Sequence, residues 1–142
     1  MLDEALALVE PNISRIDFTL VSAICFGRLG CIAEQEGDLE AAADWHRRAM
    51  EVATPSHHLL MLQPFATVVE GLAALQAARG DHAGAAGLLG TAHSLHGFRD
   101  PSSYDVERTE AAVLAAIGRE AFDLAYERGR QVSRAEAIAL RP

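Results

Sequence analysis

The chain has 142 residues, of which 50% are apolar and 23% charged, so it is long enough to bury the core of one domain and too apolar to stay disordered. Its 20 acidic side chains outnumber its 12 basic ones, which gives a formal net charge of −8. Because binding to nucleic acid depends on cations that neutralise phosphates, this balance argues against a nucleic-acid interface on this segment.

The distribution of charged and apolar residues favours a cytoplasmic protein without a membrane partner. The first ten residues carry acidic side chains but no cation, so they do not match a secretory signal. The longest wholly apolar run covers residues 111–117, whereas a membrane-spanning helix needs about 20 apolar residues. In the cytoplasm, Cys25 and Cys31 are expected to stay reduced.

The spacing of apolar residues and of turn residues predicts an all-helical chain. Clean alternation of apolar and polar residues, which is typical of strands, does not occur in the sequence. Turn signals divide the chain into eight expected helices, near residues 2–10, 13–36, 38–53, 57–79, 81–96, 103–117, 119–130 and 133–140. Since the connections are short, successive helices should lie antiparallel.

Three short motifs predict how helices end and begin. In Gly37-Asp38 and Gly80-Asp81, the glycine can adopt the left-handed conformation that ends one helix, and the aspartate can cap the next. Each pair therefore predicts a tight corner between two helices. At the start of the last expected helix, Ser133 and Glu136 have the spacing of a capping box.

The sequence repeats itself at an interval of 43 residues. A shift by this interval places Leu29-Gly30 on Leu72-Ala73 and Gly37-Asp38 on Gly80-Asp81. This pattern resembles the tetratricopeptide repeat (TPR), in which helical hairpins stack side by side. Further positions that fit the repeat are Phe26, Ala42, Trp45 and Ala49. Because Gly30 and Ala42 are small, they are expected to form a close crossing between two helices.

The resemblance implies one all-α domain over residues 1–142, an α-solenoid of about three TPR-like hairpins. It divides into an N-terminal helix or half repeat over residues 1–12, a repeat over 13–54, a second over 55–97, and a degenerate repeat with a capping helix over 102–142. The first of these segments has an apolar stripe that no preceding helix covers, formed by Leu2, Ala5, Leu6 and Val9. We therefore expect either a homodimer through an end of the solenoid or a helix folded back on its neighbour.

The C-terminal half carries a second resemblance. Its segments 85–92, 115–122, 126–130 and 133–139 are similar to the C-terminal region of LuxR/AfsR-like bacterial transcriptional regulators of the signal-transduction ATPase type. This likeness implies the sensor or docking tail of such a regulator. It implies no ATPase chemistry, because the sequence contains no lysine and so no phosphate-binding loop that ends in Gly-Lys-Ser/Thr.

In a TPR stack the first helix of each hairpin lines a concave groove, and the resemblance assigns this role to matching positions here. The expected groove residues are Gly27, Cys31, Glu34, Glu70, Ala74, Ala77 and Arg108, with Ala112 as a further position. Glu34, Glu70 and Arg108 are the expected exposed contacts for a protein or peptide partner. The alternative is that the long first helices bury some of these residues against their neighbours.

The sequence predicts no catalytic residue, no metal site and no cofactor. His93 and His96 could place two imidazoles on one helix face, and His57-His58 follow a turn, but no carboxylate or thiol has a companion spacing. Cys31 lies late in an expected helix, without the base that would activate it. Two other functions remain as alternatives: a sensor that binds a small-molecule inducer in an apolar pocket between repeats, and a metal-dependent enzyme that uses the histidines.

Overall fold

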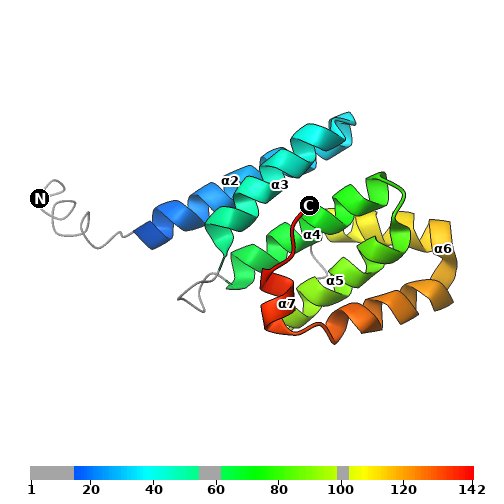
Figure 1. Cartoon of the computed structure of the whole chain (residues 1–142). Coiled ribbons are helices and arrows are strands. Elements are labelled where there is room, and N and C mark those ends of the chain that lie inside the picture. Colours follow the sequence, from blue (N-terminus) through cyan, green and yellow to red (C-terminus); the bar gives the residue numbers. More distant parts are fainter. Residues whose placement is uncertain (1–14, 55–61, 99–102) are drawn as a thin grey trace, which may run out of the picture.

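The computed structural model describes residues 15–54, 62–98 and 103–142, which form six helices and no strand (Figure 1). The helices are α2 (Arg15–Glu36), α3 (Leu39–Ala53), α4 (Leu62–Ala78), α5 (His82–His96), α6 (Tyr104–Arg130) and α7 (Arg134–Ile138). The all-helical class is confirmed, whereas the expected number of eight helices is wrong for the described residues. The expected helix 2–10 lies outside them, and the helices expected at 103–117 and 119–130 are joined in α6.

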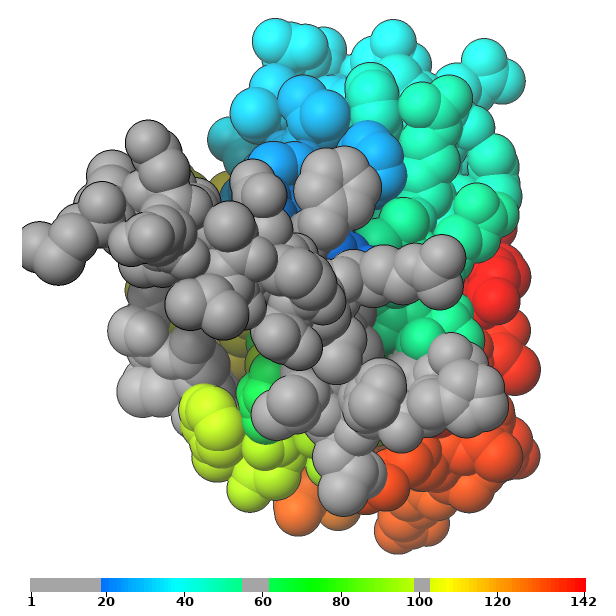
Figure 2. Space-filling model, turned by 90° about the vertical axis from the view of Figure 1, so that its left-hand side faces the viewer, coloured from blue at the N-terminus to red at the C-terminus, as the bar shows by residue number. Residues whose placement is uncertain are grey.

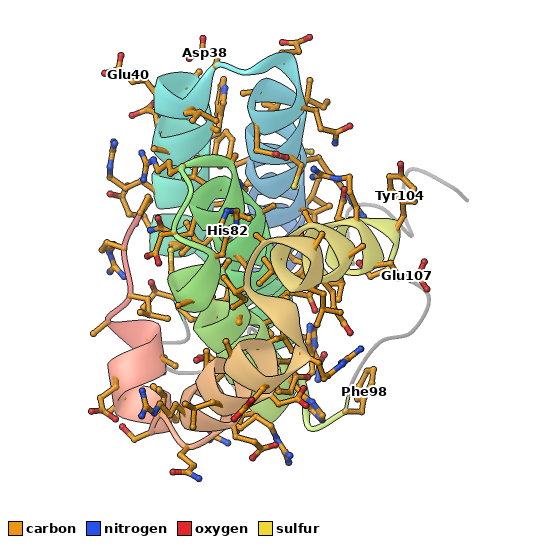
Figure 3. The ribbon with its side chains drawn as sticks, turned by 90° about the vertical axis from the view of Figure 1, so that its right-hand side faces the viewer. Asp38, Glu40, His82, Phe98, Tyr104 and Glu107 are labelled. Carbon is orange, nitrogen blue, oxygen red and sulfur yellow. The ribbon has the colours of Figure 1, made fainter. Side chains whose placement is uncertain are left out.

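The long helix α6 contains a sharp kink at the glycine where the sequence predicts a break. Gly118 has a φ of 78° and a ψ of 168°, which are not helical values. Residues other than glycine are strained at such a positive φ, so Gly118 permits the helix to change direction. The two arms, residues 104–117 and 119–130, consequently run in different directions (Figure 3).

The two Gly-Asp corners are built by the same hydrogen bonds, which confirms their prediction. At the first corner the N–H of Asp38 donates to the Ala33 carbonyl at 2.9 Å, and the N–H of Gly37 donates to the Glu34 carbonyl at 3.0 Å. Gly37 has a φ of 85°, and the Asp38 carboxylate accepts from the N–H of Ala41 at 3.0 Å. Figure 3 shows Asp38 at this corner. The pattern is a Schellman motif followed by an N-cap.

The second corner repeats this geometry between α4 and α5. Gly80 has a φ of 86°, and the N–H of Asp81 donates to the Gln76 carbonyl at 2.9 Å. The Asp81 carboxylate accepts from the N–H of Gly84 at 2.9 Å. The 43-residue interval of the sequence thus corresponds to two successive helical hairpins, α2–α3 and α4–α5.

Helix α4 is the centre of the described fold. It packs against α2, α3, α5 and α6, and Figure 1 shows it between the α2–α3 pair and α5. Because neighbours cover it on most sides, ten of its residues are buried, and its sequence is mostly apolar. One group of buried side chains joins α2, α3 and α4 with parts of α5 and α7, and a second group joins α4, α5 and α6.

The C-terminal residues cover the first of these groups. The expected capping box is confirmed, because the Ser133 hydroxyl accepts from the N–H of Glu136 at 3.2 Å and the Glu136 carboxylate accepts from the N–H of Ser133 at 2.9 Å. This cap starts the five-residue helix α7, whose Ala137 is buried in the core. Figure 2 shows the red C-terminal residues beside the end of α3.

Candidate functional site

The first helices of the hairpins surround a hollow of about 260 Å³, which we call the α2–α4 groove. The residues that line it are Ala23, Ile24, Gly27, Arg28 and Cys31 of α2, Pro64, Thr67, Val68, Glu70 and Gly71 of α4, and Ser103 and Asp105 at the start of α6. Neither α3 nor α5 contributes to its lining. Three of the residues expected from the sequence, Gly27, Cys31 and Glu70, therefore lie together around one hollow.

The floor of the groove is made of small and aliphatic residues. An added Cβ on Gly27 would lie 3.8 Å from Val68 of α4, so glycine at this position leaves room rather than avoiding a clash. Ala23 and Val68 are buried, and Gly71 lies beside them on α4. Such a floor can bind an apolar group, and its small side chains provide the space for one.

Two ion pairs connect α2 to α6 at one side of the groove. Arg28 reaches Asp105 at 3.0 Å, with the Arg28 side chain 66% exposed. The guanidinium of Arg108 donates to both oxygens of Glu34, at 3.3 and 2.7 Å, and the Glu34 side chain is only 8% exposed. This carboxylate raises the pKa of Arg108 above its ordinary value.

The expectation that Glu34, Glu70 and Arg108 are exposed contacts is wrong, since all three are partly buried and bonded within the chain. Glu70 accepts from Nε2 of His96 at 3.0 Å, and its side chain is 13% exposed. The other ring nitrogen of His96 faces the Gln63 side-chain oxygen at 2.5 Å. Each of these side chains is bonded to a residue on another helix. Helical periodicity in the sequence does not reveal such partners.

The remaining expected groove residues lie outside the hollow. Ala74 is buried, Ala77 packs half-buried against the core between α4, α5 and α6, and Ala112 is exposed on α6. A rotation of the helix by one position, about 100°, moves a side chain from the groove into the core. The period of the sequence does not fix the rotation of a helix about its axis. The prediction that Ala74, Ala77 and Ala112 line the groove is therefore wrong.

Cys31 lines the groove as a thiol rather than as a thiolate. Burial raises its pKa to about 11, and the nearby Asp105 carboxylate adds to this shift. A thiol with a raised pKa is a poor nucleophile at neutral pH. The half-buried side chain thus offers the groove a small, apolar and polarisable surface with a weak S–H donor.

His46 of α3 is a residue of this region that the sequence analysis missed. Its side chain is fully buried, and neither ring nitrogen has a hydrogen-bond partner among the described residues. Burial lowers its pKa to about 4. The ring tip lies between two glycines: an added Cβ on Gly30 would come within 2.6 Å of Cε1, and one on Gly71 would also meet the ring.

Gly30 also belongs to the expected close crossing with Ala42, which stays a prediction. The atoms nearest to a Cβ added at Gly30 belong to the His46 ring, so the glycine makes room for this ring. Ala42 is itself buried in the core. The sequence does contain a signal for the buried ring. The first helices α2 and α4 each carry a glycine, Gly30 and Gly71, and both glycines leave space for the His46 side chain.

His93 and His96 make structural contacts. Nδ1 of His93 lies 2.6 Å from the Tyr126 hydroxyl, which joins α5 to α6, and His96 bonds to α4 as described above. Within residues 15–54, 62–98 and 103–142, no three His, Cys, Asp or Glu side chains come together as a metal site would require. His57-His58 lie outside these ranges.

Comparison of the chain with protein-family models, with curated proteins and with solved structures gives no match. The resemblance to TPR proteins therefore stays a prediction from the sequence pattern. In the part of the chain that the structure describes, no helix combines the length and the apolar character that crossing a membrane requires.

Proposed function

We propose that the chain is a TPR-like α-solenoid that acts as a non-catalytic protein-interaction module, and that a segment of a partner protein binds in the α2–α4 groove. One observation carries this proposal: α2, α4 and the first arm of α6 meet around one hollow, whereas α3 and α5 do not reach it. In a stack of hairpins, this is the face that successive first helices share. The matching corners at Gly37 and Gly80 support the same arrangement.

The size and lining of the groove indicate the chemistry of the partner. Its volume of about 260 Å³ is below the range of roughly 300–1,000 Å³ typical of small-molecule pockets, which favours a single anchoring side chain. The small and aliphatic floor suits an aliphatic or aromatic side chain. Arg28, Thr67 and Asp105 at the border can hydrogen-bond the backbone of the segment that carries this anchor.

The wider role that we propose is that of a docking tail in a cytoplasmic bacterial transcriptional regulator. Its support is the similarity of segments 85–92, 115–122, 126–130 and 133–139 to the C-terminal region of LuxR/AfsR-like regulators. The net charge of −8 agrees with a tail that leaves DNA binding to another part of such a regulator.

The proposal can be tested by selecting peptides from a display library against the intact chain and titrating the best of them. Gly27→Leu places a side chain in the groove, and the 3.8 Å distance to Val68 allows the first added carbon without a clash. We expect this variant to weaken peptide binding at least tenfold. Ala116→Leu is the matched control, because it adds a similar side chain at an exposed site on α6. Equal binding by both variants would contradict the proposal.

The alternative is a sensor that binds a small-molecule inducer, and the mainly apolar floor of the same hollow favours it. Ligands that bind only the folded state raise the melting temperature. A melting temperature raised by metabolites and unchanged by the selected peptides would support the sensor instead. Gly27→Leu should then abolish the shift caused by the metabolite.

A further inference from the structure

His46 presents a polar group that the fold buries without a partner. Nearly all buried polar side chains in proteins are hydrogen-bonded, so an imidazole with two unbonded nitrogens requires an explanation. The space around it is also specific: Gly30 of α2 and Gly71 of α4 both lack the Cβ that would clash with the ring. Helices α2 and α4 thus leave a slot between them for the His46 side chain of α3.

The slot lies directly behind the α2–α4 groove. Gly71 borders the ring and also lines the groove, while Gly30 is adjacent in sequence to Cys31, which lines the groove from α2. Because no residue of α3 lines the hollow, the ring reaches the seam between α2 and α4 from the opposite side. The ring therefore fills the seam whose other side is the floor of the groove.

We propose that His46 is a wedge that sets the separation of α2 and α4, and that protonation of its ring withdraws the wedge and loosens the groove. The inference rests on the proposed function only in treating the groove as the binding site. The wedge itself depends on the position of the ring between Gly30 and Gly71. His46 is thus a positioning residue, which acts on a ligand through the helices that border the groove.

The ionisable groups close in sequence to Gly30 and Gly71 are already engaged. On α2, Glu34 is held by Arg108 and Cys31 is a neutral thiol; on α4, Glu70 is bonded to His96. The buried face of α3 carries no ionisable residue besides His46, because its other members are Ala42, Ala43, Ala49, Met50 and Ala53. A protonated ring would find no carboxylate in the slot and must move toward water. Its lowered pKa agrees with this picture.

Cys31 provides a reporter for the width of the groove. In a Cys25→Ser chain it is the single thiol, and its rate of reaction with 4,4′-dithiodipyridine can be measured from pH 7.5 to pH 4. Each rate is divided by that of the urea-unfolded chain at the same pH. Since the thiol pKa lies well above this range, about 11 in the folded chain against 9.0 ordinarily, a change of pH alone alters both rates by the same factor, and the ratio reports how deeply the thiol is buried.

We expect the ratio of the folded to the unfolded reaction rate of Cys31 to be constant above pH 6 and to rise at least tenfold by pH 4. Circular dichroism should show that the helices persist over this range. His46→Phe keeps a ring in the slot but cannot be protonated, so its ratio should not change with pH. His46→Gln is a second variant that does not titrate, in case phenylalanine does not fit. His82→Gln, at the start of α5, is the histidine control and should keep the pH profile of the parent.

Three results would overturn the proposal. The first is a ratio that stays constant down to pH 4 with the helices intact, and the second is the same rise in a folded His46→Phe or His46→Gln variant. The third is a rise that follows the loss of helicity, since this would be unfolding of the chain. No peptide is used, so failure of the wedge and failure of peptide binding are distinguished.

Discussion

Single residues decide how closely the helices of this protein approach one another, and glycine acts in two different ways. At Gly27 it leaves an empty space, which becomes the floor of the groove. At Gly30 and Gly71 it makes room for the imidazole of His46. The same residue type thus creates a hollow at one position and allows tight packing one helical turn away.

The buried state of His46 predicts that acid destabilises the fold. Its pKa is about 4 in the folded chain against 6.5 ordinarily, so the unfolded chain binds more protons between these values. The contribution of neutral His46 to the free energy of unfolding is fully present well above pH 6.5 and decreases as the pH falls toward 4. Below pH 4 this group causes no further loss of stability. Between pH 7 and pH 5 the loss should be about 2 kcal/mol.

This loss can be measured by urea denaturation at both pH values. Other groups also titrate in this range, and His46→Phe therefore serves as the reference: its free energy of unfolding should decrease by about 2 kcal/mol less than that of the parent. Equal losses in parent and variant would show that His46 does not cause the effect.

The contact between Gly30 and His46 predicts that their substitutions are coupled. Gly30→Ala alone should lower the free energy of unfolding by about 1–3 kcal/mol, because the added Cβ meets a ring that Gly71 confines from the other side. In a His46→Ala background the same change should be neutral or stabilising, since alanine is the better helix former. Urea denaturation of the four chains gives the coupling energy. A coupling near zero would mean that the ring can move aside.

At the scale of helices, α5 and the second arm of α6 approach until their backbones touch. Cβ atoms added to Gly90 or Gly129 would overlap the backbone of Tyr126 or Gly87. The Thr91 hydroxyl fixes the contact, since it lies 3.0 Å from the Gly129 carbonyl and 3.1 Å from that of Gly87. This interface is therefore held by the backbone and cannot adapt by rotating a side chain.

Gly129→Ala should accordingly be among the most destabilising alanine substitutions, with a loss of about 3 kcal/mol or more. Gly87→Ala is its control, because a Cβ there would be 3.6 Å from the Ala125 carbonyl, which is an ordinary contact. That variant should gain up to about 1 kcal/mol from helix propensity. Thermal or urea denaturation measures both, and similar losses would indicate that the helices separate easily.

The two ion pairs between α2 and α6 should differ in strength. Glu34 and Arg108 are joined by two hydrogen bonds in a partly buried setting, so their coupling energy should be about 1.5 kcal/mol or more. Arg28 is 66% exposed, and its pair with Asp105 should contribute at most about 0.5 kcal/mol. Double-mutant cycles with alanine measure both couplings. Equal values would argue that burial of Glu34 does not strengthen its pair.

At the scale of the whole molecule, the outer side of α2 exposes an apolar stripe. Val21, Leu29 and Ile32 are 56%, 39% and 51% exposed. At about 100° per residue they lie within one arc of the helix. Such an exposed apolar stripe is an expected contact for another copy of the chain.

We therefore expect the chain to form a homodimer through this side of α2. Sedimentation velocity at increasing concentration should show association, and Ile32→Asp should abolish it. Leu124→Asp is the control, because Leu124 is 56% exposed on α6 and should not affect the dimer. A monomer at all concentrations, or the same effect from both variants, would contradict the prediction.

The local features of the fold could be predicted because their causes lie within a few residues. The corners at Gly37-Asp38 and Gly80-Asp81, the capping box at Ser133 and the kink at Gly118 are each built from neighbouring backbone groups. The candidate site was predicted in part. Gly27, Cys31 and Glu70 line one hollow, because groove positions recur with the helical period.

The sequence by itself determined the helical class, the Gly-Asp corners and the caps, since apolar spacing and capping residues act over short distances along the chain. Only the tertiary structure decided how each helix is rotated and which side chains meet across helices. The pairing of Glu34 with Arg108 and the burial of His46 between two glycines join residues far apart in sequence. Such contacts depend on packing in three dimensions, and a one-dimensional period does not contain that information.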